Sequence, residues 1–243
     1  MLDFTSFCEQ YHSIFDKNNL QHLCTEEIIS KFYAFTTLLI EENSHTNLTA
    51  IRETPDIIAK HYADCLLAES FFPKNASVMD VGCGGGFPTI PLAIARPDLS
   101  ITAIDSTQKK INFVQKSTAA LGLQNIIAVC TRAEATELRK HREQFDVVTS
   151  RAMARTSILT ELILPFAKPE GVMIALKGAQ GSTELQEAEN AITLLGGKTE
   201  LDKEISLATA TETESRHILI IRKKKKSPDQ YPRNYSLITK KPL

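Results

Sequence analysis

Length and composition place this chain among soluble globular proteins. It has 243 residues, of which 42% are hydrophobic and 23% charged, with a formal net charge of −1, and a chain of this size can bury a full hydrophobic core. It lacks a run of about 18 apolar residues, and its start is neither basic nor followed by a long apolar stretch, so we expect no membrane span and no signal peptide. The five cysteines are scattered and odd in number, which favours reduced thiols in a cytoplasmic protein and argues against a zinc site.

The charge is distributed unevenly along the chain. Residues 216–243 carry nine Lys or Arg and one acid, which gives +8, whereas the remainder carries 19 basic and 28 acidic residues, which gives −9. We therefore assign residues 223–243 as a basic C-terminal tail that can contact nucleic acid. A solvated, disordered tail would have the same composition, so both interpretations stay open.

The first 75 residues have helical periodicity and are expected to form an N-terminal helical extension packed on the core. Apolar residues recur at helical spacing between Phe4 and Phe15. Thr25 is placed to cap a second helix, and Thr54-Pro55 is a typical start for a third. The buried face of this third helix should contain Ile58, His61, Tyr62, Cys65 and Leu66.

A glycine-rich loop follows the first strand-like run. The run 77–81 is a short, mainly apolar strand with an acid, Asp80, near its end, and glycines then stand at alternate positions: Gly82, Gly84 and Gly86. Glycine allows a sharp turn and a close approach of a ligand to the backbone. A dinucleotide-binding loop would need glycine at position 87, which is Phe87. The spacing instead resembles motif I of class I methyltransferases, which bind S-adenosyl-L-methionine.

From Ser77 onward strand and helix patterns alternate. Such β-α units predict a parallel sheet covered by helices on both faces, which we assign to residues 76–222. The last two strands have no long helix between them, so a terminal antiparallel hairpin is expected, as in a class I, Rossmann-like methyltransferase with a mainly parallel seven-stranded sheet. The expected strands are 77–81, 100–105, 125–130, 145–149, 171–176, 199–207 and 217–221, and the expected helices lie near 89–95, 108–121, 133–140, 157–166 and 183–195.

Candidate ligand-binding residues follow the first four strands of this predicted sheet, beginning with Gly82–Gly86 after the first. In an open parallel sheet the ligand lies at the carboxyl ends of the strands. Asp105 and Ser106 follow the second strand, and an acid there can accept hydrogen bonds from ribose hydroxyls. Arg132-Ala133-Glu134 follow the third strand beside the expected adenine position, and Ser150-Arg151-Ala152 follow the fourth. A helix cap at Asp105 and a first-turn charge at Glu134 are the structural alternatives.

The acceptor of the methyl group is constrained by two motifs that the sequence lacks. Methylation at pyrimidine C5 usually needs a cysteine after proline, and neither Cys83 nor Cys130 follows one. Methylation of an exocyclic amine usually needs an Asn/Asp-Pro-Pro-aromatic turn after the fourth strand, where this chain has Ser150-Arg151-Ala152-Met153. A ring nitrogen with a free lone pair, such as guanine N7, needs neither feature. A hydroxyl or small-molecule acceptor stays open.

Further motifs resemble the bacterial 16S ribosomal RNA guanine-N7 methyltransferase family, also called the glucose-inhibited division protein B family. The resemblance covers most of the chain. It lies in Asn47–Ile51, in His61-x-x-Asp64-x-Leu66, in Asp80–Leu92, in Leu176-Lys177-Gly178, in Glu214–His217, and in Tyr231-Pro232-Arg233 with Lys240–Leu243. The chain departs from the family pattern at Gly85, where proline is common, and at Thr89, which replaces glycine.

This resemblance implies a set of functional residues. The cofactor contacts of the family fall on Gly82, Phe87, Asp105-Ser106, Ala133-Glu134 and Arg151, and the motif adds Gly84 and Gly86 to them. Arg132 and Arg216 match arginines that are important for function, and we expect them to position the target base. No metal is expected.

The sequence therefore predicts an S-adenosylmethionine-dependent enzyme that methylates N7 of a guanine in 16S rRNA. Its partner would be 16S rRNA, the small ribosomal subunit or an assembly intermediate, and we expect a cytoplasmic monomer without membrane contact. The alternatives are a methyltransferase for another RNA or a small molecule on the same fold, and a noncatalytic rRNA-binding assembly factor.

Overall fold

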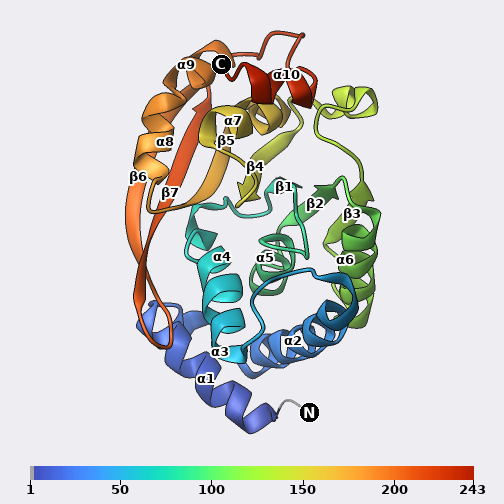
Figure 1. Cartoon of the computed structure of the whole chain (residues 1–243), viewed down its shortest axis with the longest axis vertical. Coiled ribbons are helices and arrows are strands. Elements are labelled where there is room, and N and C mark those ends of the chain that lie inside the picture. Colours follow the sequence, from blue (N-terminus) through green and yellow to red (C-terminus); the bar gives the residue numbers. More distant parts are fainter. Residues whose placement is uncertain (1–2) are drawn as a thin grey trace.

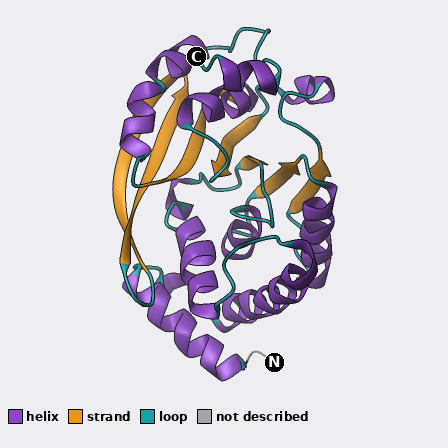
Figure 2. Cartoon of the chain, in the orientation of Figure 1, coloured by secondary structure: helices purple, strands orange, loops and turns teal. Residues whose placement is uncertain are grey.

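The fold is built on a central seven-stranded sheet with helices on both faces (Figures 1 and 2). The computed structural model describes residues 3–243. The strand order is β3-β2-β1-β4-β5-β7-β6, and all neighbouring pairs are parallel except β5–β7 and β7–β6. The strand order reverses between β1 and β4, which is where the topology of an open parallel sheet predicts a ligand site. The strands are β1 (Ser77–Val81), β2 (Ser100–Asp105), β3 (Ile126–Cys130), β4 (Phe145–Arg151), β5 (Ala167–Gly178), β6 (Gly197–Ala208) and β7 (Thr213–Lys223).

The helices lie in two groups on opposite faces of the sheet. The first consists of α1 (Phe4–Lys17), α2 (Glu26–Thr46), α3 (Thr54–Asp56), α4 (Asp64–Leu66), α5 (Thr89–Ala95) and α6 (Gln108–Ala120). The second consists of α7 (Thr156–Ile163), α8 (Gly181–Glu187), α9 (Glu189–Leu194) and α10 (Tyr235–Lys240). Each group encloses its own cluster of buried apolar residues. No helix within residues 3–243 is long and apolar enough to cross a membrane.

The N-terminal helices share one core with α5 and α6. Thr25 caps α2 through its hydroxyl, which accepts from the amide of Ile28, as its position before an apolar run predicted. Helices α3 and α4 are joined by a π-helical segment, Ile57–Ala63, into one stretch whose predicted inner face is buried. Asn18, after α1, exchanges two hydrogen bonds with the backbone of Ala208 at the end of β6, at 2.8 and 2.9 Å.

The predicted fold class is confirmed, and most elements lie where the sequence placed them. The expected strand 171–176 begins earlier, at Ala167, since β5 also pairs with Phe145 before a register shift. Gly171 sits at this irregularity, and a Cβ there would lie 2.9 Å from two backbone carbonyl oxygens. The expected helix 133–140 is a 3-10 helix at Thr136–His141, and the expected helix 183–195 is divided into α8 and α9.

The segment after β7 is folded against the second helix group. Lys223, the last residue of β7, is fully buried, and its ammonium donates to the carbonyl of Leu164 and the hydroxyl of Ser227. Burial lowers the pKa of Lys223 to about 8. The three lysines that follow it are exposed or paired at the surface, as Lys224 is with Glu170. Further along, Ile238 of α10 is buried in the second core cluster.

Two glycines with positive φ offer a test of this packing. Gly196 has φ +83°, and a Cβ there would lie 2.2 Å from the carbonyl oxygen of Lys225, whereas Gly122 has φ +64° and no atom within 4 Å of a Cβ. We expect Gly122→Ala to lower the free energy of unfolding by about 1 kcal/mol through backbone strain alone. Gly196→Ala should cost roughly 1–3 kcal/mol more, because the methyl group displaces the segment after β7. Urea unfolding of both variants measures the difference, and equal losses would contradict this packing.

Candidate functional site

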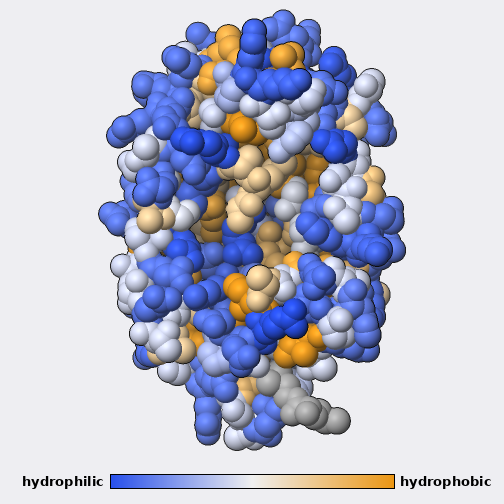
Figure 3. Space-filling model, viewed as in Figure 1, coloured by the Kyte–Doolittle hydropathy of each residue, from blue (hydrophilic) through white to orange (hydrophobic). Residues whose placement is uncertain are grey.

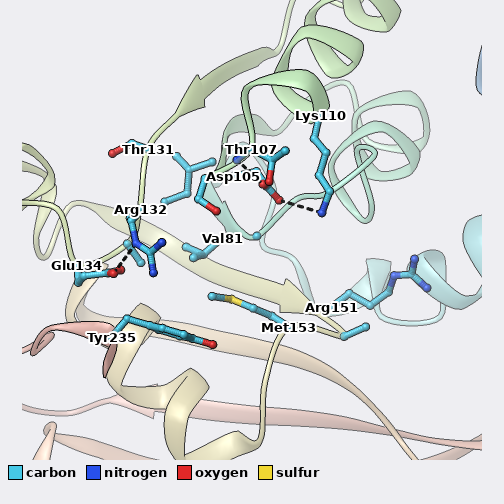
Figure 4. Close-up of a pocket in the computed structure, with 15 residues that line it drawn as sticks. Val81, Asp105, Thr107, Lys110, Thr131, Arg132, Glu134, Arg151, Met153 and Tyr235 are labelled. Atoms are coloured by element: carbon cyan, nitrogen blue, oxygen red, sulfur yellow. Dashed lines mark hydrogen bonds and ion pairs between the residues drawn. The ribbon is translucent and has the colours of Figure 1, made fainter. Parts of the chain in front are cut away.

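A pocket of about 430 Å³ lies at the carboxyl ends of β1, β2, β3 and β4. The space-filling view shows this face of the molecule hollowed near its centre (Figure 3). The volume is within the range of roughly 300–1,000 Å³ that is usual for small-molecule sites. Figure 4 shows the side chains that surround it. The lining residues are Val81, Gly82, Ile104, Asp105, Ser106, Thr107, Lys110, Thr131, Arg132, Ala133, Glu134, Arg151, Ala152, Met153 and Tyr235.

The three glycines of the loop after β1 have different roles. Gly82 lines the pocket with φ +76°, and a Cβ there would press on the side chain of Met153 at 3.1 Å. Gly84 lies outside the lining, and its amide donates to the carboxylate of Asp105 at 3.0 Å. Gly86 has φ +93° and packs on α5, where a Cβ would meet Ile90 at 2.6 Å. The loop therefore needs glycine at 82 for the pocket wall, at 84 for a backbone φ of +56° and at 86 for the contact with α5.

Six of the nine residues that we expected to bind a cofactor line this pocket: Gly82, Asp105, Ser106, Ala133, Glu134 and Arg151. Gly84 and Gly86 shape the loop behind it. Phe87 does not line the pocket, because its ring is buried against the imidazole of His61, with ring centroids 4.2 Å apart. Phe87 thus joins the glycine loop to the N-terminal helices.

Asp105 holds the loop and faces the pocket at the same time. One carboxylate oxygen accepts from the amide of Gly84, and the other accepts from the amide of Thr107 at 2.8 Å. Thr107, and not Asp105, is the N-cap residue of α6. Each carboxylate oxygen can accept a second hydrogen bond, since a carboxylate has about four acceptor sites. The geometry therefore fits two hydroxyl donors in the pocket.

The residues after β3 form the opposite end of the pocket. Arg132 donates through Nε to the carboxylate of Glu134 at 2.7 Å, and its guanidinium lies over the ring of Tyr235, 5.4 Å from the centroid (Figure 4). Glu134, for which a charge in the first turn of a helix was the structural alternative, therefore orients Arg132. Ala133, between them, is buried.

Arg151 runs from the pocket toward the N-terminal helices. Its guanidinium donates to the carboxylate of Asp64 and to the carbonyl of Lys60, both at 2.9 Å. Arg216 donates through Nε to the other oxygen of Asp64 at 2.7 Å, and it also pairs with Glu214. Asp64 therefore joins the end of β4 to β7.

Arg216 lies in a second pocket, of about 570 Å³, and not in the first. The two expected base-positioning arginines are thus separated, with Arg132 in the first pocket and Arg216 in the second. Arg151, Ala152 and Met153 line both pockets. Ala152 has φ +51°, an uncommon conformation for a residue with a side chain. The other charged residues of the second pocket are Lys60, Asp64, Lys177 and Glu184, which with Arg151 and Arg216 make four cations and two anions.

His61 has a defined tautomer in this arrangement. Its Nδ1 lies 3.1 Å from the guanidinium of Arg151, which can only donate, so Nδ1 accepts and Nε2 carries the proton. Nε2 then donates to the hydroxyl of Thr49 at 2.8 Å. Burial, with the positive charge of Arg151, lowers the pKa of His61 to about 3. The imidazole is therefore neutral near pH 7.

Asp80 and Thr89 form a buried pair beneath the glycine loop. The Thr89 hydroxyl donates to the Asp80 carboxylate at 2.6 Å, and neither side chain is exposed. Burial raises the pKa of Asp80 to about 7. Thr89, which departs from the family pattern, is accommodated because its hydroxyl satisfies one oxygen of this acid.

Sequence reasoning did not identify several residues of the site. Thr131 and Met153 directly adjoin predicted site residues, so their place in the chain was a usable signal. Lys110, in the first turn of α6, lies 4.0 Å from the Asp105 carboxylate. Tyr235 comes from α10, far from the strands in sequence, and no pattern in the sequence placed it there.

The strand order and the position of the pocket define the fold of a class I methyltransferase. A structure described as M. jannaschii TYW2 in complex with AdoMet aligns with a TM-score of 0.54 and 15% identity, covering 67% of this chain and 77% of that one. A SAM-dependent methyltransferase from Aquifex aeolicus also aligns with a TM-score of 0.54, at 14% identity, covering 72% of this chain and 97% of that one. These similarities concern the fold.

Sequence comparison defines the family. A model of the GidB family, described as rRNA small subunit methyltransferase G, matches residues 28–219. The ribosomal RNA small subunit methyltransferase G of Oceanobacillus iheyensis is 42% identical over 240 residues, covering 97% of this chain and 98% of the relative. That of Macrococcus caseolyticus is 43% identical over 232 residues, covering 92% and 97%. The chain belongs to this methyltransferase family, as its motifs predicted.

The pKa of His61 leads to a testable pH dependence. The folded state keeps His61 neutral down to about pH 3, whereas the unfolded chain protonates it near pH 6.5. Between these values the unfolded state binds more protons, so this group's contribution to stability is full above pH 6.5 and is lost as the pH falls. We expect His61→Gln to reduce the slope of unfolding free energy against pH between pH 6.5 and 4.5, by up to about 1.4 kcal/mol per pH unit.

Urea unfolding at several pH values measures this slope. His12→Gln is the control, because His12 is exposed on α1. Asp80, with its raised pKa, contributes a slope of opposite sign that is common to all the variants. An unchanged slope in a folded His61→Gln protein would contradict the neutral, buried imidazole.

Proposed function

We propose that this protein transfers a methyl group from S-adenosyl-L-methionine to N7 of a guanine in 16S rRNA, with the cofactor in the first pocket and the target base in the second. The observation that carries the proposal is the junction of the two pockets at Arg151, Ala152 and Met153. Direct transfer requires the donor and the acceptor to meet with the reacting atoms roughly 3–3.5 Å apart. Two adjoining pockets with a common wall provide such a meeting point.

The residues of the first pocket fit this cofactor. The free acceptor sites of the Asp105 carboxylate would accept from the two ribose hydroxyls, and Gly82, which lines the pocket without a side chain, would let the ligand approach the backbone. Two buried polar atoms of lining residues, Thr131 Oγ1 and Arg151 Nε, have no hydrogen-bond partner among residues 3–243. Because buried polar groups are usually paired, these atoms favour a polar ligand in the pocket. When bound, S-adenosylmethionine supplies an electrophilic methyl group on a sulfonium.

The second pocket is polar and suits a base that is neutral before the transfer. Its four cations are each paired with an acid, Arg151 and Arg216 with Asp64, Lys177 with Glu184 and Lys60 with Glu214, so these side chains are held in fixed positions around the pocket. Guanine N7 has a free lone pair, so the protein needs no general base to deprotonate it. Asp64 accepts from both Arg151 and Arg216, and the neutral His61 accepts from Arg151, so these two residues fix the arginines and do not act as bases. Catalysis then rests on positioning and electrostatics.

Arg132 and Arg216 would act from different pockets. Arg132 belongs to the cofactor pocket, where it is exposed enough to reach a substrate as well. Arg216 belongs to the base pocket. Lys223 lies seven residues further along β7, about 23 Å from Arg216 at the usual rise of a strand. The lysine run that follows therefore supplies contacts to phosphates remote from the target base, which set affinity without reading sequence.

Asp105 gives a direct test of the cofactor site. We expect Asp105→Asn to weaken binding of S-adenosylhomocysteine by roughly 1.5–3 kcal/mol, since it removes the charge from hydrogen bonds to the ribose. A modest loss of stability should accompany this change, because the new amide group faces the Gly84 or the Thr107 amide. Asp98→Asn is the matched control, because Asp98 also accepts from a backbone amide but lies far from the pocket. Calorimetric titration compares the variants, and wild-type affinity in Asp105→Asn would refute the ribose contact.

The reaction is tested by mapping the product. We expect the wild-type protein, with S-adenosylmethionine and unmodified 16S rRNA or small subunits, to create a single site at which borohydride and aniline cleave the RNA at a guanine. Arg216→Ala should slow single-turnover transfer by about 10–100-fold, because the target base loses its alignment. Arg222→Ala is the control on the same strand, paired with Glu200 away from both pockets. Methyl incorporation without cleavage would identify another acceptor atom.

A further inference from the structure

The chain returns to the cofactor pocket after the last strand of the sheet. Beyond β7 it crosses the upper end of the molecule in Figure 1 and enters α10, whose first residue is Tyr235. Tyr235 lines the first pocket, together with residues that follow β1 to β4. The other lining residues within the described part of the chain lie at the ends of β1 to β4, in the loops that follow these strands, or in the first turn of α6. Tyr235 alone comes from a later segment.

The segment that carries Tyr235 is held in place by a buried ion pair. Glu161 of α7 is fully buried, and its two carboxylate oxygens accept from Nε and an Nη of Arg233 at 2.7 and 2.6 Å. The backbone amide of Arg233 also donates to Glu161 at 3.0 Å. Arg142 donates to the carbonyls of Ser227 and Tyr231 further back in the segment. Tyr235 follows Arg233 by two residues, so these contacts also fix the position of Tyr235 in the protein without ligand.

The position of the ring identifies which part of a ligand it meets. The Asp105 carboxylate lies at the end of β2, and Arg132 and Ala133 lie beyond it, after β3. Tyr235 lies with the latter, under the guanidinium of Arg132 (Figure 4). Gly82 and Arg151, at the ends of β1 and β4, are on the other side of Asp105. A ligand whose ribose meets Asp105 thus places its base toward Tyr235 and its amino-acid part toward Arg151.

We propose that Tyr235 is a cofactor-binding residue that stacks on the adenine ring of S-adenosylmethionine, and that Arg233 and Glu161 are its positioning residues. The inference rests on the cofactor site proposed above. An aromatic ring in this place offers a flat apolar surface to the flat base. Where proteins bind nucleic-acid bases, stacking on an aromatic side chain contributes about 1–3 kcal/mol of binding free energy per base. Arg132, over the same ring, would border the stack through its planar guanidinium.

Binding measurements on the full chain test the proposal without any methyl transfer. We expect Tyr235→Ala to raise the dissociation constant of S-adenosylhomocysteine about tenfold, in keeping with the usual contribution of a base–aromatic stack. Tyr235→Phe keeps the ring and should stay within about twofold of wild type. Leu237→Ala is the matched control, because Leu237 is exposed on the same short helix and does not line the pocket. Thermal unfolding of each variant confirms that it is folded.

A second ligand separates the adenine from the rest of the cofactor. Methylthioadenosine has the adenine and the ribose but no amino-acid part, so Tyr235→Ala should weaken it by the same factor as S-adenosylhomocysteine. A loss seen with S-adenosylhomocysteine alone would place Tyr235 at the amino-acid end and overturn the proposal, as would an unchanged affinity in a folded Tyr235→Ala protein. If the wild-type chain bound neither ligand, the cofactor site itself would be wrong, which Asp105→Asn tests separately.

Discussion

The carboxylate of Asp64 joins three parts of the molecule that are far apart in sequence. One oxygen accepts from Arg151 at the end of β4, and the other accepts from Arg216 on β7. Asp64 itself belongs to the helix that packs the N-terminal extension onto the sheet. Removing one partner from such a buried group of charges typically costs roughly 3–5 kcal/mol, because an uncompensated charge is left behind. The shape of the second pocket and the far end of the first both depend on this interaction.

The sequence predicted the fold and the family because both are encoded locally. Parallel strands buried on two faces are continuous apolar runs, and the glycines and helix starts that follow them are recognisable within a few residues. The carboxyl ends of adjacent parallel strands meet at one edge of the sheet, which is why residues after four strands were correctly expected to converge. Asp105 was placed this way, although its two hydrogen bonds to backbone amides could only be seen in three dimensions.

The parts that the sequence did not predict depend on contacts between distant segments. Phe87 belongs to a recognised motif, yet its ring packs on His61 and does not line the pocket, whereas Gly82 of the same motif does. Arg216 and Arg132 are both arginines at strand ends, but the sheet places them in different pockets. Tyr235 lies at the site because Arg233, two residues earlier, forms an ion pair with the buried Glu161 of α7. The composition of residues 223–243 indicated only positive charge, whereas the apolar burial of Ile238 and the hydrogen bonds of the buried Lys223 ammonium pack this segment against the second helix group.

The hydrogen bonds between Asn18 and Ala208 have a consequence for how the molecule folds. They join residues 190 positions apart, and the Asp64–Arg216 pair closes a separation of 152. Contacts of such long range form only after the entropy of closing a large loop has been overcome, so they slow folding. The N-terminal helices are made early in synthesis, but their hydrogen-bonding partners on β6 and β7 are made late. During translation the nascent chain therefore lacks Arg216 of the second pocket and Tyr235 of the first until nearly all of the sheet has been synthesised.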